Sequence, residues 1–177
     1  RLHEVMDLCI SCKACKSECP SNVDMAKMKS DVAQLYYDEH GISFRDRLIR
    51  DSSRMASRMS GSLAGIINLV QRTSLFKMLL EKMVGFDRRK NLPEYAHQPF
   101  YKWFEKKANH FRSVDKKVVL FADTYLNFHE PNIGISALEL LNSCGYEVIL
   151  ANVGCCQRPK LSRGFVRDAK KEGMITV

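Results

Sequence analysis

Four cysteines near the start of the chain have a spacing that suits a metal cluster. Intervals of two, two and three residues separate them, and a proline follows the last: Cys9, Cys12, Cys15, Cys19 and Pro20. Thiolate is the side-chain ligand that favours iron–sulfur clusters over hard metal ions. Cysteines at these intervals hold [4Fe–4S] clusters. The spacing therefore predicts that Cys9, Cys12, Cys15 and Cys19 bind iron.

The same run occurs in bacterial ferredoxins, where the fourth cysteine binds a companion cluster. No second run of this kind follows in the chain. We therefore expect a companion motif upstream of Arg1, or else a one-cluster variant in which Cys19 completes its own cube. A zinc site or a disulfide pair is the competing interpretation. It is less favoured, because structural zinc sites usually join two separated C-x2-C pairs.

Composition limits the class of protein. A chain of 177 residues with 45% hydrophobic residues has room for one or two small domains with buried cores. No apolar run is long enough to cross a bilayer. Seven cysteines, four of them in a cluster motif, indicate a reducing compartment and hence a cytoplasmic protein. The net charge of +8 suggests an acidic partner, and charge alone does not choose among anionic lipid, nucleic acid and an acidic protein surface.

The segment after Pro20 should form a helix that supports the cysteine loop. Asp24 is an N-cap candidate, and a helix is expected from about Met25 to Glu39, ending before Gly41. Its apolar residues recur at steps of three and four, which predicts one buried face: Met25, Met28, Val32, Leu35 and Tyr36.

Residues 44–85 read as basic and apolar helices. The most apolar part, 61–85, allows two interpretations. Its helices could bury their faces in a small helical domain, which is the favoured interpretation. Alternatively, one helix could lie in a membrane surface with its cations at the headgroups. In the second interpretation, the protein is cytoplasmic and contacts the inner face of the membrane peripherally through this helix.

The hydrophobic pattern changes at Lys116. Residues 118–122 and 146–150 are short apolar runs typical of parallel strands, with a helix expected over 132–143 between them and another near Gly164. The predicted fold class is a mostly α-helical ferredoxin-like segment followed by a partial α/β domain of β-α-β-α order. The predicted divisions are 1–86, a linker over 87–115, and 116–177.

A second cysteine site is possible after the second strand. Cys155 and Cys156 lie where the carboxyl ends of parallel strands place ligands. They suit a cluster or a redox role, although two small buried residues in a turn would look the same. Cys144, at the end of the predicted helix, is expected to be a packing residue.

Three stretches together resemble the iron–sulfur portion of FAD-linked 2-hydroxyacid dehydrogenases of the D-lactate, D-2-hydroxyglutarate and glycolate type. They are Cys9–Ala26, Phe121–Pro131 and Gly154–Pro159. The resemblance implies that Cys9, Cys12 and Cys15 bind one [4Fe–4S] cluster and that Cys19 binds its companion. It also implies that Cys155 and Cys156 form the double cysteine of a heterodisulfide-reductase-like domain.

Two residues depart from the family pattern. Gln157 follows the double cysteine where the family usually has glycine, and Thr124 stands where many members have a cysteine. The other ligands of a second site are therefore expected beyond Val177.

The expected function is electron relay. By the resemblance, FAD on a separate oxidase domain or subunit oxidises a small 2-hydroxy acid. The cluster then passes electrons to an acceptor, a quinone or a redox protein. The chain is a module of an oxidoreductase and is not expected to be catalytic alone. Two alternatives remain open: an iron–sulfur subunit of a heterodisulfide-reductase-like or anaerobic glycerol-3-phosphate dehydrogenase complex, and a zinc-structured nucleic-acid-binding protein. For the favoured function no nucleic acid is expected.

Overall fold

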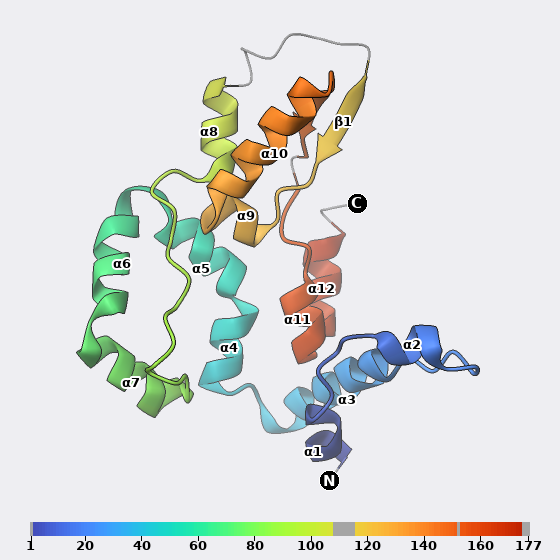
Figure 1. Cartoon of the computed structure of the whole chain (residues 1–177). Coiled ribbons are helices and arrows are strands. Elements are labelled where there is room, and N and C mark those ends of the chain that lie inside the picture. The colour runs from blue at the N-terminus through green and yellow to red at the C-terminus, as the bar shows by residue number, and fades with distance from the viewer. Residues whose placement is uncertain (1, 108–115, 152, 175–177) are drawn as a thin grey trace. The chain divides into compact units, whose positions relative to one another are not determined.

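The computed structural model describes residues 2–107, 116–151 and 153–174. These residues are mostly helical and include one two-stranded parallel sheet, which confirms the predicted fold class (Figure 1). Their contacts group the chain into two compact units. The first joins residues 1–51 to residues 156–177, and the second comprises residues 52–155. Among the described residues, no helix is both long and apolar enough to span a bilayer.

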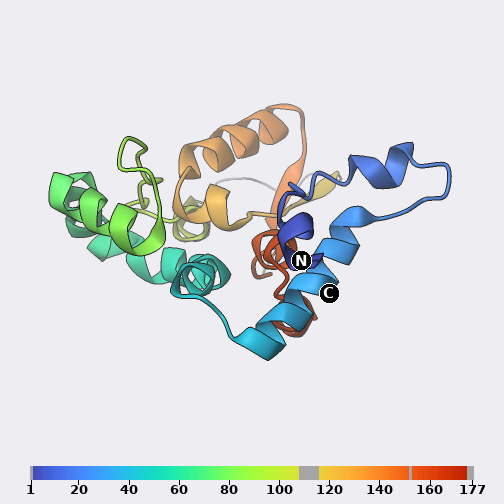
Figure 2. The ribbon, with the colours of Figure 1, turned by 90° about the horizontal axis from the view of Figure 1, so that it is seen from below.

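The first unit is built from six helices of the described chain. They are α1 (Leu2–Asp7), α2 (Ala14–Glu18), α3 (Met25–His40), α4 (Phe44–Arg50), α11 (Arg158–Arg163) and α12 (Val166–Gly173). The helix predicted after Pro20 is confirmed as α3, the long helix that Figure 2 shows in light blue. Asp24 caps it by accepting a hydrogen bond from the Lys27 backbone N–H at 2.9 Å. Helices α1, α11 and α12 all pack against α3.

The buried face of α3 differs from the predicted one. The buried side chains are Ala26, Lys29 and Ala33, whereas Leu35 and Met28 are 62% and 46% exposed. The reason is a close approach by the end of α11. A Cβ atom on Gly164 would lie 2.3 Å from the Ala33 Cβ. Only small residues on α3 permit this distance, and hydrophobic periodicity does not detect a face made of small side chains.

The second unit contains the parallel sheet. Its elements are α5 (Ser52–Met59), a 3₁₀ turn η1 (Gly61–Leu63), α6 (Ala64–Arg72), α7 (Ser74–Val84), α8 (Phe100–Lys107), β1 (Lys117–Leu120), α9 (Thr124–Phe128), α10 (Pro131–Ser143) and β2 (Glu147–Leu150). Strands β1 and β2 pair in parallel, with Lys117 opposite Glu147 and Leu120 opposite Leu150. Helices α9 and α10 lie between them in the chain, and α10 corresponds to the helix of the predicted β-α-β unit.

The core of the second unit lies where α8 and α10 meet. Phe100 and Leu138 are among its most deeply buried side chains. A Cβ atom on Gly134 would lie 2.7 Å from the Phe100 ring, so α10 approaches α8 closely at this glycine. Phe100 falls within the segment predicted to be a linker. Helix α8 was not expected there, because its mixture of aromatic and cationic residues obscures the helical period.

An extended segment joins α7 to α8 and is held against α6. The Asn68 side-chain amide donates to the Tyr95 carbonyl and accepts from the Tyr95 N–H, both at 2.9 Å. The Asn68 amide thus satisfies both backbone polar groups of Tyr95, as a neighbouring strand would do in a sheet. Residues 108–115 of the predicted linker lie outside the described part. The predicted domain limits stay predictions.

Candidate metal centre

The four cysteines of the first run lie on one loop and one short helix of the first unit. Cys9 follows α1, Cys12 lies on the loop, Cys15 is in the first turn of α2, and Cys19 ends that helix. Cys12 is exposed, and the other three are partly buried. The Cys19 N–H donates to the Cys15 carbonyl at 3.0 Å, so α2 sets the distance between these two residues. The thiols therefore lie within reach of solvent on one continuous segment.

The backbone beside the cysteines adopts an uncommon conformation. In the described chain, the non-glycine residues with positive φ are Ser11, Lys13, Asn22 and Gln157, at 53–65°. Each of them lies within three residues of a cysteine. Left-handed backbone at a residue with a side chain costs about 1 kcal/mol or more and concentrates at functional sites. The local strain thus marks the same two cysteine segments that the spacing of the cysteines indicates.

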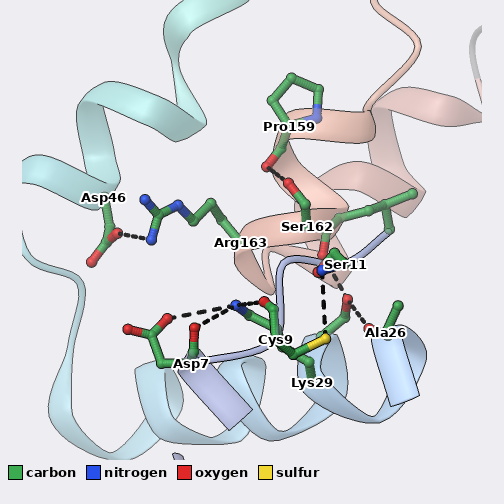
Figure 3. Close-up of polar contacts among 11 residues, drawn as sticks. Asp7, Cys9, Ser11, Ala26, Lys29, Asp46, Pro159, Ser162 and Arg163 are labelled. Atoms are coloured by element: carbon green, nitrogen blue, oxygen red, sulfur yellow. Dashed lines mark hydrogen bonds and ion pairs between the residues drawn. The ribbon is translucent and has the colours of Figure 1, made fainter. Parts of the chain in front are cut away.

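Backbone N–H groups point at two of the sulfurs. The Ser11 N–H donates to the Cys9 Sγ at 3.4 Å (Figure 3). Hydrogen bonds from the backbone of Val23, Ser21 and Asn22 lower the pKa of the Cys19 thiol. N–H donors favour the thiolate, which is the form that binds metal. An N–H donor therefore reaches a sulfur at each end of the cysteine run.

A buried lysine holds the start of the loop. The Lys29 ammonium donates to the Cys9 carbonyl at 2.6 Å and to the Asp7 carbonyl at 3.2 Å, as Figure 3 shows. Its Nζ also lies 3.6 Å from an Asp7 carboxylate oxygen. Lys29 is not among the residues predicted for the site. The available signal was its position between Ala26 and Ala33, at steps of three and four on the small-residue face of α3.

The donor set of the first run fits an iron–sulfur cluster. Four thiols occur at the required intervals, and N–H donors reach the first and the last. In the described part of the chain, no three His, Cys, Asp or Glu side chains converge on one point. The structure thus brings Cys9, Cys12, Cys15 and Cys19 into one segment and leaves their sulfurs spread along it.

The second cysteine pair lies between β2 and α11. Cys155 is partly buried and Cys156 is exposed, and the boundary between the two compact units falls between them. Gln157 follows with φ 59° at the start of α11. Cys144, expected to be a packing residue, is exposed at the end of α10. Grouping by contacts thus assigns Cys155 to the second unit and Cys156 to the first.

Comparison with known proteins links the chain to dehydrogenases. One subunit of the anaerobic glycerol-3-phosphate dehydrogenase of Escherichia coli (strain K12) is 28% identical over 146 residues, 82% of this chain. The D-2-hydroxyglutarate dehydrogenases of Escherichia coli (strain K12) and Haemophilus influenzae are 30% and 24% identical over 98% and 96% of this chain. No family model and no solved structure matches.

The matched relatives are much longer than the chain. It spans 37% of the glycerol-3-phosphate dehydrogenase subunit and 17–18% of the D-2-hydroxyglutarate dehydrogenases. The similarity therefore concerns one region of each relative. Most of this chain aligns with that region. The relatives are named as dehydrogenases, which are oxidoreductases. The chain is thus similar to a part shared by two kinds of dehydrogenase, and this similarity supports a role in electron transfer.

Proposed function

We propose that the chain is the iron–sulfur electron-transfer module of an FAD-linked dehydrogenase. Cys9, Cys12 and Cys15 would bind one [4Fe–4S] cluster, and Cys19 would bind its companion or complete the same cube. The observation that carries the proposal is the strained cysteine loop with N–H donors at both ends. The similarity to two kinds of dehydrogenase supports it from a different direction.

Each part of the loop has a definable task in this function. When bound, a [4Fe–4S] cluster accepts and releases single electrons. The N–H donors at Cys9 and Cys19 stabilise sulfur charge, and helix α2 holds Cys15 and Cys19 one helical turn apart. The proposed partners are an FAD-binding domain or subunit and an acceptor, a quinone or redox protein. The module is not expected to be catalytic alone.

Two substrate classes fit the comparisons. We favour a dehydrogenase of a small 2-hydroxy acid, because one of the D-2-hydroxyglutarate dehydrogenases aligns over 98% of this chain and the glycerol-3-phosphate dehydrogenase subunit over 82%. A subunit of a glycerol-3-phosphate dehydrogenase or heterodisulfide-reductase-like complex is the alternative. The natural reading frame distinguishes them. An FAD-binding domain encoded in the same frame supports the first, whereas a separately encoded flavin protein supports the second.

Anaerobic reconstitution tests the proposed function. The chain, with its natural flanking sequence restored, is incubated with iron and sulfide, and bound metal and visible absorption are measured. We expect bound iron and sulfide in equal amounts and a broad brown absorption that bleaches on reduction. A colourless protein that retains zinc instead would contradict the proposal. That result would favour the zinc-structured nucleic-acid-binding alternative.

The apolar surface of α6 and α7 suggests a further contact for this module, with the anionic inner face of a cytoplasmic membrane. Its side chains, together with Leu63 of the preceding turn η1, are 46–68% exposed: Leu63, Ile66, Leu69, Val70, Leu75, Met78, Leu79 and Met83. Arg72 and Lys82 lie at the last turns of the two helices, and the chain has a net charge of +8. Apolar side chains with flanking cations suit a lipid surface.

Sedimentation with anionic phospholipid vesicles tests this contact. Leu75 and Leu140 are both 64% exposed, but only Leu75 belongs to the α6–α7 surface. We expect Leu75→Glu to reduce the bound fraction severalfold and Leu140→Glu to leave it nearly unchanged. Equal binding by all three proteins would contradict membrane contact through these helices. In that case a protein surface would be the better candidate for the partner.

A further inference from the structure

Lys29 is a buried cation whose packing role alone does not explain its charge. Only 9% of the residue is exposed, on a face of α3 otherwise made of alanine. Burying an ammonium group is costly unless oxygen atoms replace its water. A methionine of similar length would fill the same space without that cost. The charge therefore requires an explanation beyond filling the core.

The oxygen atoms around the ammonium belong to the residues that begin the cysteine loop. Two are the carbonyls of Asp7 and Cys9, at 3.2 and 2.6 Å, and the third is an Asp7 carboxylate oxygen at 3.6 Å. Two of the three ammonium donors thus have hydrogen-bond acceptors, and the nearby carboxylate balances the charge as an ion pair. The Lys29 side chain thus joins helix α3 to the first cysteine, which precedes it by some twenty residues in the sequence (Figure 3).

We propose that Lys29 is the positioning residue of the cysteine loop and that its charge favours the reduced state of a cluster bound there. This inference rests on the proposed function. By holding the Cys9 carbonyl, Lys29 fixes where the first thiolate starts. One-electron reduction adds a negative charge to the cluster. A neighbouring buried cation stabilises added negative charge more than an exposed one does, because water screens it less.

The positioning role is tested on the metal-free full chain. Lys29→Met removes the donors and keeps the length of the side chain. Lys27→Met is the matched control, because Lys27 is on the same helix and exposed. Hydrogen exchange at the amides of residues 9–13 should become severalfold faster in Lys29→Met and remain unchanged in Lys27→Met. Lys29→Arg should restore most of the protection. Equal exchange in Lys29→Met and wild type would overturn the positioning role.

The charge effect is tested by redox titration of the reconstituted protein. Dithionite supplies the electron. Lys29→Met should make the cluster severalfold to tenfold harder to reduce, and tenfold is about 59 mV for one electron. Lys27→Met should leave the midpoint potential near the wild-type value. Identical potentials in Lys29→Met and Lys27→Met would overturn the charge effect while leaving the proposed function intact.

A second variant covers the case in which Lys29→Met fails to take up iron. Asp7→Asn removes the carboxylate that opposes the ammonium, and its side chain is 61% exposed, so the fold should tolerate the change. The potential should then rise. A lower or unchanged potential would contradict the proposal. If wild-type protein takes up no iron at all, the proposed function and the charge effect both fail, and the exchange measurement still decides the positioning role.

Discussion

The first cysteine run and the Cys155–Cys156 pair share several features but differ in their support. Both are followed by a proline within three residues, and both have left-handed backbone beside a cysteine. In the first run, the loop is held by buried Lys29, and α3 behind it is capped by Asp24. The second pair lies where the chain passes from one compact unit to the other.

The difference means that the backbone already supports the thiols of the first run, whereas the Cys155–Cys156 pair lies at the boundary between two units. In the first run, four thiols at cluster spacing lie on one stretch of chain, with N–H donors at both ends. Two adjacent thiols supply part of a set and depend on ligands elsewhere. Spacing and local support together therefore distinguish the two segments more clearly than the number of cysteines does.

The largest expected effect concerns loss of iron. Cys12→Ala should abolish most of the iron and sulfide bound after reconstitution, because one ligand of the first run is removed. Cys155→Ala combined with Cys156→Ala should leave the content nearly unchanged, as should Cys144→Ala. Metal and sulfide assays measure the result. Equal losses in Cys12→Ala and the double variant would break the distinction between the two segments.

The next effect concerns the helix that follows the second pair. Gly164→Ala should lower the free energy of unfolding by about 3 kcal/mol, because φ is +89° and the new Cβ would meet Ala33 at 2.3 Å. Gly145→Ala has a similar φ of +81° and open space, so it should cost about 1 kcal/mol. Urea denaturation measures both. Similar costs would mean that α11 does not pack closely on α3.

A smaller effect should follow from removing the cap of α3. Asp24→Ala deletes the acceptor for the Lys27 N–H and should cost about 1 kcal/mol of unfolding free energy. Asp24→Asn keeps an acceptor and should cost much less. Denaturation of the metal-free chain measures the effect. If Asn and Ala destabilise equally, the cap does not support the helix behind the first run.

The smallest effect depends on pH. Tyr37 on α3 stacks on Phe165, which follows α11, with ring centroids 4.9 Å apart. Burial, together with the negative charge of Asp46, raises the pKa of Tyr37 to about 12. The unfolded state, with an ordinary tyrosine pKa near 10, loses the proton first. This contribution to stability is therefore complete below about pH 10 and is lost between about pH 10 and 12.

Comparison with Tyr37→Phe isolates that contribution. The wild-type protein should lose more stability than the variant between about pH 9 and pH 11. Urea denaturation midpoints at the two pH values measure the difference. Identical losses would show that Tyr37 ionises in the folded state as it does in the unfolded one.

The regular elements could largely be predicted from local patterns. Asp24 and Gly41 bound α3 as expected, and apolar runs located β1 and β2. These signals are local, because capping side chains and strand residues act on their immediate neighbours. Helix α8 escaped prediction, since aromatic residues in a basic stretch also suit a linker. The contact that buries Phe100 comes from α10, about thirty residues later.

The sequence proposes ligands for the candidate site, but it does not indicate the residues that support the cysteine loop. Cysteine spacing identifies the first run without any structure. Lys29 escaped because lysine is normally exposed. The same helix is also packed by the end of α11, where Gly164 approaches Ala33 from more than 120 residues away. The Ser30 hydroxyl donates to the Leu161 carbonyl at 2.6 Å across the same long separation. Contacts of this range leave no periodic trace in the sequence.

The pairing of α3 with α11 also has a consequence for biosynthesis. The helix behind the iron ligands depends for its packing on segments that the ribosome delivers well over a hundred residues later. Domains generally fold as units during synthesis. The amino-terminal thiols should therefore remain on an incompletely packed nascent chain until α11 and α12 have emerged. Delivery of iron would be productive only after that moment.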